Sequence, residues 1–213
     1  MRAACYIDGF NLYHAVEALG DRSLKWTNLA GLARSYMKPG DELIRTVFFT
    51  AFNTWNPDKR RRHVNYVKAL EAHGVETCLS RFDKVNKHCH SQNRYCPIRE
   101  EKQTDVSIAV TMLSDCYELG IQRIVLITAD SDQVPAVKAI KAKFPETVVV
   151  MIAPPGRLKN ARELGGVCDG VSEITRQRLR ENQLPLDIRD GRGKLIAARP
   201  AQYGDRFAAG PED

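Results

Sequence analysis

The chain has 213 residues, of which 27% are charged and 43% hydrophobic, with a formal net charge of +6 and a sequence pI near 9.0. This composition is typical of a globular domain, and no apolar run approaches the roughly 20 residues of a transmembrane helix, so we expect no membrane partner. Asp8 interrupts the first apolar stretch before a signal-peptide core can form, which predicts a cytoplasmic protein. The excess positive charge favours a polyanionic partner.

Strand and helix patterns alternate along residues 1–180, which we interpret as one domain. Short runs rich in β-branched residues indicate buried strands, and apolar residues at helical spacing indicate the helices between them. We expect strands at 3–7, 43–51, 75–81, 123–128, 147–152 and 171–174, and helices at 12–19, 27–37, 57–74, 104–119, 133–143, 160–164 and 175–182. The alternation predicts an α/β, three-layer sandwich with a mainly parallel central sheet.

Two segments fall outside this pattern. Residues 82–100 have no apolar periodicity, so we interpret them as an insertion outside the core, a loop unless its cysteine and histidine side chains bind zinc. Residues 181–213 are rich in Gly, Pro and Ala, and we interpret them as a partly flexible C-terminal extension. Within that extension, residues 194–198 have the composition of an edge strand.

Four aspartates are expected at one edge of this sheet. Asp8 ends the first strand, Asp130 and Asp132 follow the strand at 123–128, and Asp105 lies in the first turn of the helix at 104–119. Taken alone, each has an ordinary structural explanation as a turn residue or a helix cap. Because ligands of parallel sheets gather at the carboxyl ends of the strands, their coincidence there favours a shared site.

Clustered carboxylates repel one another, and a hard divalent cation such as Mg²⁺ or Mn²⁺ is the natural compensation. We expect Asp8 and Asp130 to be direct metal ligands, and Asp105 and Asp132 to bind directly or through water. Such an ion can polarise a phosphate and activate water, so phosphodiester hydrolysis needs no protein nucleophile. Asn11 would orient a ligand or water, and Lys102 would meet a substrate phosphate unless it is only a solvated charge.

Three ordered motifs carry a family resemblance: Tyr-Ile-Asp-Gly-Phe-Asn-Leu-Tyr from residue 6, Glu-Lys-Gln-Thr-Asp-Val-Ser-Ile-Ala-Val from residue 101, and Ile-Thr-Ala-Asp-Ser-Asp-Gln-Val-Pro from residue 127. They resemble the NYN domains, or LabA-like proteins, of the PIN-like nuclease superfamily. The resemblance spans roughly residues 2–175 and implies a PIN-like fold, an acidic metal site and ribonuclease activity. Ser131 matches the small residue between the last two aspartates, whereas Gln133 stands where many relatives have an aromatic residue.

Other signals are weaker. Lys59-Arg60-Arg61-Arg62 begins a helix, and we count Arg60 and Arg61 as candidate substrate contacts, although a solvated face explains them equally well. Zinc in the insertion, between Cys89 and Cys96 with Cys78 or His90, is less favoured because no Cys-x-x-Cys pair is present. His14 could assist proton transfer but is more simply a surface histidine. We expect Cys5, Cys116 and Cys168 to fill the core.

The favoured function is a metal-dependent ribonuclease. The alternative from another class is a non-catalytic, regulatory RNA-binding protein that keeps the PIN-like fold; concentrated negative charge argues against it, because the partner is itself an anion. A phosphatase with an aspartyl nucleophile would need a second aspartate two residues after the first, and Phe10 stands there. DNA remains open as a substrate, and so does a homodimer.

Overall fold

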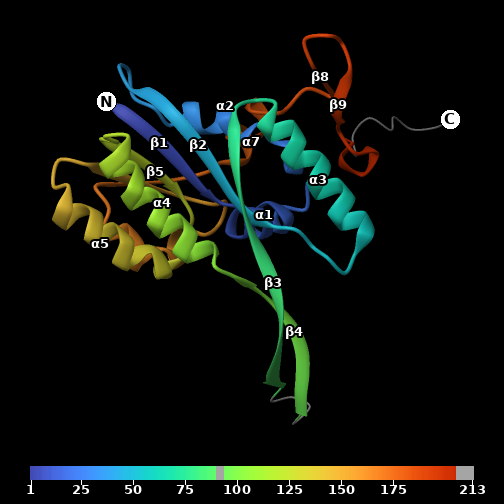
Figure 1. Cartoon of the computed structure of the whole chain (residues 1–213), viewed down its shortest axis with the longest axis horizontal. Helices are drawn as coiled ribbons and strands as arrows, with labels where there is room; N and C mark the ends of the chain where they lie inside the picture. Colours follow the sequence, from blue (N-terminus) through green and yellow to red (C-terminus); the bar gives the residue numbers. More distant parts are fainter. Residues whose placement is uncertain (90–93, 205–213) are drawn as a thin grey trace.

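A seven-stranded sheet forms the centre of the molecule in the computed structural model, which describes residues 1–89 and 94–204 (Figure 1). Its strands lie in the order β4-β3-β2-β1-β5-β6-β7. Their bounds are β1 Arg2–Asp8, β2 Glu42–Ala51, β3 Val75–Cys89, β4 Arg94–Lys102, β5 Arg123–Ile127, β6 Val148–Ala153 and β7 Gly170–Glu173. All neighbouring pairs are parallel except β3 and β4. The predicted mainly parallel sheet is therefore confirmed.

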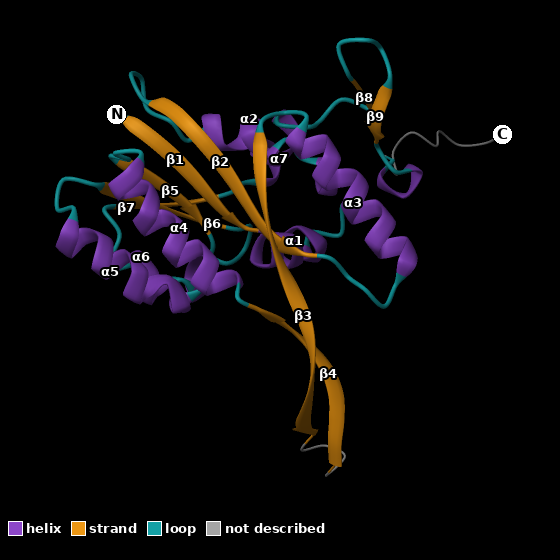
Figure 2. Ribbon diagram, in the orientation of Figure 1, coloured by secondary structure: helices purple, strands orange, loops and turns teal. Residues whose placement is uncertain are grey.

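Helices cover both faces of this sheet (Figure 2). Their bounds are α1 Gly9–Ala18, α2 Leu29–Arg34, α3 Pro57–Glu71, α4 Thr104–Glu118, α5 Val134–Lys143, α6 Arg162–Gly165 and α7 Arg176–Glu181. One hydrophobic core joins the sheet to α1, α2, α3 and α7, and a second joins it to α4, α5 and α6. These two cores confirm the predicted α/β three-layer sandwich, because each face of the sheet is buried by its own helices.

The order of the strands reverses beside β1. The chain runs outward from β1 to β2 and β3 on one side, then returns to pair β5 with the other side of β1. The carboxyl ends of β1 and β5 therefore lie next to each other, with Ile7 opposite Ile127. This is the topological switch point at which parallel sheets bind ligands.

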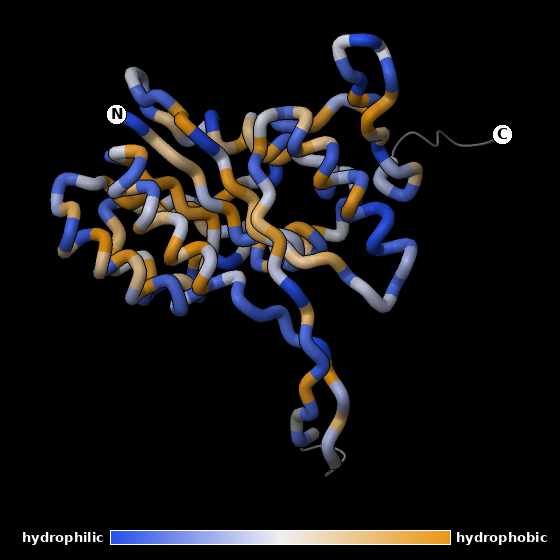
Figure 3. Tube along the Cα trace, viewed as in Figure 1, coloured by the Kyte–Doolittle hydropathy of each residue, from blue (hydrophilic) through white to orange (hydrophobic). Residues whose placement is uncertain are grey.

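The insertion at residues 82–100 is a β-hairpin and not a loop. β3 continues past its expected end at residue 81 to Cys89, and β4 returns antiparallel from Arg94 to Lys102. The hairpin projects from the body of the protein (Figure 1), and mostly hydrophilic residues line it (Figure 3). Because both of its faces are largely free of the core, the apolar alternation that marks a half-buried strand is missing.

The C-terminal extension contains a small second sheet, in which β8 (Asp187–Arg189) pairs with β9 (Leu195–Ala198). The expected strand at 194–198 therefore exists, but it pairs with β8 and not with the central sheet. Asn65 of α3 donates from its side-chain amide to the carbonyl oxygen of Ala198 at 2.7 Å. Among the helices of the described ranges, none has the length and apolar character needed to cross a membrane.

Candidate functional site

Asp8 lies at the end of β1 and begins α1. Its Oδ1 accepts the backbone N–H of Asn11 at 3.0 Å, which caps the helix, and its Oδ2 accepts the hydroxyl of Thr128 at 2.8 Å. Only 5% of Asp8 is exposed. The cap moves the start of the helix from the expected residue 12 to residue 9 and fixes the direction of the carboxylate.

Gly9 lets α1 start directly against β2. A β-carbon at this position would lie 2.5 Å from the backbone oxygen of Phe49 and 2.6 Å from the Phe48 ring. Real side chains do not fit in that space, so the residue after Asp8 has to be glycine. The close approach holds Asp8 at the switch point.

Asp130 follows β5 and repeats the same arrangement. Its Oδ1 accepts the backbone N–H of Asp132 at 3.0 Å and caps a short 3-10 helix, Ser131–Gln133. Its own backbone N–H donates to the Thr128 hydroxyl at 3.2 Å. Thr128 is fully buried and thereby links the first aspartate to the second.

Asp105 lies in the first turn of α4, a different element from those that carry Asp8 and Asp130. The side chain of Gln133, which is completely buried, donates from Nε2 to Asp105 Oδ1 at 3.2 Å and to the Asp105 backbone oxygen at 3.3 Å. Just before the helix, Gln103 has φ = 78°. A non-glycine residue in this left-handed region is strained by about 1–3 kcal/mol, and here it turns the chain from β4 into α4.

Asp8, Asp105 and Asp130 converge on one point. One carboxylate oxygen from each lies within 4.8 Å of the others, and among the described residues no other group of three or more such side chains does so. Two oxygens on opposite sides of one Mg²⁺ are about 4 Å apart, so small side-chain movements would bring all three into range. The donors are hard anionic oxygens, which fit Mg²⁺ or Mn²⁺. Capping and metal binding are thus compatible roles for the same aspartates.

The electrostatics of the cluster favour a cation. Burial raises the pKa of Asp8 to about 6, and the charges of Asp105 and Asp130 add to that rise, against the hydrogen bonds that lower it. Burial, followed by the charge of Asp130, also raises the pKa of Asp105. Glu101, at the end of β4, has a raised pKa from burial and from the charges of Asp8 and Asp105. A positive ion would relieve these repulsions.

The family model for the NYN domain matches residues 2–175. The chain belongs to the NYN domain family. NYN is a PIN-like nuclease family, so the resemblance in the three motifs is confirmed. A crystal structure of a protein of unknown function from Vibrio parahaemolyticus has the same fold, with a TM-score of 0.53 and 16% sequence identity over 86% of this chain and 96% of that chain. No curated protein matches the chain.

The remaining candidate residues of this NYN domain lie around the aspartates. The side-chain oxygen of Asn11 accepts the backbone N–H of Ala129 at 3.3 Å and so joins α1 to the loop after β5. Asp132 and Ser131 are exposed, and Asp132 lies outside the group of three although its charge acts on Asp105. Lys102 pairs with Glu100 at 2.8 Å.

The basic run is divided between two sides of α3. Lys59 and Arg62, one turn apart, line a cavity beside α1, whereas Arg60 and Arg61 line a different depression. Arg61 also pairs with Asp58 at 2.9 Å. The sequence singled out Arg60 and Arg61, but helical spacing turns Lys59 and Arg62 toward the cavity that Gly9 and Phe10 also line.

The zinc prediction stays untested. His90 and the side chain of Cys89 lie outside the described residues, while Cys78 and Cys96 are partly buried. Of the expected core cysteines, Cys5 and Cys116 are buried and Cys168 is partly buried.

Sequence reasoning missed three supporting residues: Thr128, Gln133 as a partner of Asp105, and Glu101. Thr128 is part of the third motif, and its place as the last residue of an expected buried strand was the available signal. Gln133 was noted only for its difference from aromatic relatives. Glu101 is the first residue of the second motif, but its approach to the aspartates depends on the hairpin and could not be derived from that position.

Proposed function

We propose that this NYN domain is a metal-dependent ribonuclease that hydrolyses RNA phosphodiester bonds. The observation that carries the proposal is the convergence of Asp8, Asp105 and Asp130, from three separate elements, within 4.8 Å at the switch point of the sheet. Membership of a PIN-like nuclease family supports nucleic acid as the substrate class. The net charge of +6 agrees with a polyanionic substrate.

The three carboxylates would hold Mg²⁺ or Mn²⁺. A divalent ion supplies charge stabilisation for the phosphate and a lower pKa for an attacking water. The chain's own part is orientation: the Thr128 hydroxyl fixes Asp8 Oδ2, and the Gln133 amide fixes Asp105 Oδ1. Outer partners of this kind hold metal ligands in place.

Asp132 and Asn11 have different roles in this proposal. Asp132 is exposed beside the cluster, so it would act through water or on a second ion. Asn11 binds the backbone after β5 and therefore positions the loop that carries Asp130. Lys102 reaches a substrate phosphate only after leaving Glu100.

A regulatory RNA-binding protein without turnover is the rival function. Its ligand would meet three converging carboxylates, and without an ion these repel a polyanion. The rival also gives no reason for the buried partners Thr128 and Gln133 to orient two of those carboxylates. The nuclease proposal explains both features together.

The test is a cleavage assay on single-stranded RNA, structured RNA and matched DNA, in Mg²⁺, Mn²⁺ or EDTA. Asp130→Asn keeps a good helix cap but removes a charge from the cluster, and we expect it to reduce cleavage by more than about 100-fold, since even outer partners contribute 10–100-fold. Asp187→Asn, an exposed change on β8, is the matched control and should leave cleavage unchanged. RNA binding without any cleavage by the wild type would favour the rival function.

A further inference from the structure

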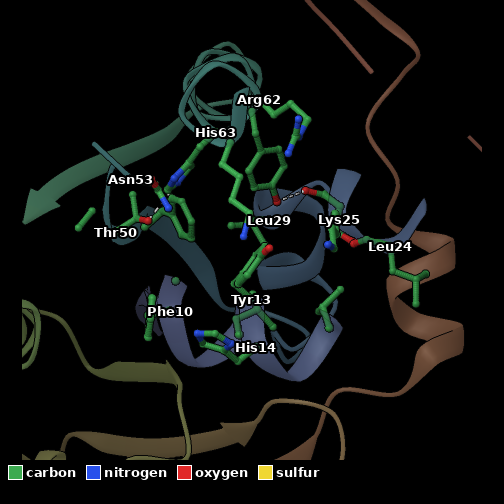
Figure 4. A pocket seen from close by; sticks show the side chains of 18 of the residues that line it. Phe10, Tyr13, His14, Leu24, Lys25, Leu29, Thr50, Asn53, Arg62 and His63 are labelled. Carbon is green, nitrogen blue, oxygen red and sulfur yellow. Dashed lines mark hydrogen bonds between the residues drawn. The ribbon is translucent and has the colours of Figure 1, made fainter. Parts of the chain in front are cut away.

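A cavity with a volume of about 320 Å³ lies between α1 and α3 (Figure 4), and Phe82 and Arg99 from the hairpin also line it. Its size is at the lower end of the range for small-molecule sites. Its wall includes residues from α1, the segment between β2 and α3, both strands of the hairpin and the C-terminal extension. The chief polar and aromatic lining residues are Phe10, Tyr13, His14, Lys25, Trp55, Lys59, Arg62, His63, Phe82, Arg99 and Tyr203.

Aromatic rings form a continuous series along one side of this cavity. The rings of Phe10 and Phe82 are 5.8 Å apart, and those of Phe82 and Trp55 are 5.1 Å apart. The guanidinium of Arg99 lies 4.4 Å from the Trp55 ring centroid. Phe10 and Trp55 are each 42% exposed, so they present ring surface to solvent. Exposed rings and a guanidinium plane are the groups on which nucleobases stack.

The charged residues that line the cavity, among those described, are all cations. The described lining residues include four cations, Lys25, Lys59, Arg62 and Arg99, and neither Asp nor Glu. Lys25 is neutralised by an ion pair with Glu17, and Arg62 interacts with the hydroxyl of Tyr203. In the described part of the chain, Lys59 and Arg99 form no salt bridge. The cavity therefore combines stacking surface with positive charge suited to a phosphate backbone.

Two connections join the cavity to the aspartates. Phe10 lines the cavity only two residues after Asp8, so their Cα atoms are at most about 7 Å apart. On the hairpin, Phe82 lies directly opposite Glu101, and residues opposite each other in a ladder share a face. Phe82 lines the cavity while Glu101 feels the charges of Asp8 and Asp105. The two regions are thus adjacent along both the helix and the hairpin.

We propose that this cavity binds an unstacked nucleobase of single-stranded nucleic acid while a neighbouring phosphate of the same strand lies at the aspartate cluster. The inference rests on the proposed function and specifies the form of nucleic acid that the site takes, a single strand with an unstacked base. Stacking on Phe10, Phe82 and Trp55 holds the base, and Lys59 and Arg99 contact the flanking backbone. A paired duplex keeps its bases stacked inside the helix and cannot fill the cavity, which selects for single strands.

Intrinsic fluorescence tests this inference separately from catalysis. The chain has two tryptophans, Trp26, which is fully buried, and Trp55, which lines the cavity. In EDTA, we expect an eight-nucleotide single strand of uridines to bind through the cavity and quench the Trp55 emission, although the metal-free carboxylates repel its phosphates and weaken the binding. The same strand paired with its complement, and a sugar-phosphate strand of equal length without bases, should bind more weakly and leave the emission unchanged. Equal binding or equal quenching by either of these would overturn the proposal.

Variants then locate the base. In Phe10→Ala and Trp55→Ala, binding of a labelled uridine strand should weaken by roughly 5- to 150-fold for each base that no longer stacks on a ring. Tyr95→Ala, at a 71% exposed hairpin position outside the cavity lining, is the control and should bind normally. Unchanged affinity in both cavity variants would overturn the inference. Because EDTA prevents cleavage in every arm, absence of nuclease activity would count against the proposed function alone.

Discussion

The aspartate cluster and the neighbouring cavity lie on either side of Gly9, yet they are built in opposite ways. The cluster takes its side chains from the ends of β1 and β5 and from the start of α4, where backbone caps and buried partners fix every carboxylate. The cavity takes its wall from one face of α1, the segment between β2 and α3, α3 itself, the hairpin and the C-terminal extension, and its rings are partly exposed. The first region is suited to holding an ion and the second to admitting a substrate.

This difference indicates which parts of the fold tolerate substitution. A ligand at the cluster requires fixed geometry, because hydrolysis depends on placing charge accurately at the phosphate. The cavity needs only ring surface and positive charge, which peripheral segments supply without altering the sheet. We therefore expect substitutions in the cluster to change stability and metal binding, and substitutions in the cavity to change substrate affinity alone.

The largest expected effect is on stability in the absence of metal. Folding raises the pKa of Asp8 from 3.8 to about 6. At a pH between these two values, the Asp8 carboxyl is mostly protonated in the folded state and mostly ionised in the unfolded state. Stability should therefore fall as pH rises through this window, by as much as about 3 kcal/mol. Asp8→Asn cannot ionise and still caps α1, so in EDTA at pH 7.5 it should unfold at a higher temperature than the wild type.

Two comparisons sharpen this prediction. At pH 4, where Asp8 is largely protonated in the folded state and about half protonated in the unfolded state, the advantage of Asp8→Asn should nearly vanish. Mn²⁺ should raise the melting temperature of the wild type more than that of the variant, which reverses their order at pH 7.5. A variant that melts below the wild type in EDTA at pH 7.5 would contradict the electrostatic account of the cluster.

The next effect concerns a buried partner of two aspartates. Thr128→Val keeps the side-chain shape but removes the donor to Asp8 and the acceptor of the Asp130 amide. We expect Mn²⁺ affinity and cleavage to decrease by roughly 10- to 100-fold. Thr147→Val is the matched control, because Thr147 is also buried and hydrogen-bonded but precedes β6 at the opposite edge of the sheet. Equal losses in both variants would point to a general effect on folding.

The smallest expected effect is on the salt dependence of RNA binding, and it distinguishes the two pairs of basic residues in the run 59–62. Lys59→Ser with Arg62→Ser removes two charges from the cavity, and Arg60→Ser with Arg61→Ser removes two from the other side of α3. The first pair should weaken binding of single-stranded RNA and lower the slope of log affinity against log salt by roughly 0.7 for each phosphate that the variant no longer binds. If the two double variants show equal slopes of log affinity against log salt, the basic run is only a solvated surface and does not contact RNA.

Much of the sheet was predictable because the buried parallel strands are short apolar runs ending in turn signals. The aspartates were predictable for a related reason: carboxyl ends of neighbouring strands meet at one edge, so Asp8 and Asp130 had to lie close together. The hairpin was not predictable as strands, because side chains outside a core carry no burial pattern. Only its exclusion from the core followed from the sequence.

The supporting contacts could not be derived from local patterns. Gln133 reaches Asp105 across 28 positions of sequence, and Glu101 approaches the aspartates only because β4 folds back on β3. The cavity combines residues as distant as Phe10 and Tyr203. Contacts of this kind depend on the packing of peripheral segments, whereas sequence periodicity reports only which face of each element is buried.

The most direct test of the central claim is Mn²⁺ binding measured by electron paramagnetic resonance, in which bound Mn²⁺ loses the sharp signal of the free ion. We predict that the wild type binds Mn²⁺ and that the chain with Asp8→Asn, Asp105→Asn and Asp130→Asn, shown to be folded by circular dichroism, does not. Equal binding by the two chains would place the ion elsewhere. No binding by the folded wild type at millimolar Mn²⁺ would contradict the account of the cluster as a metal site.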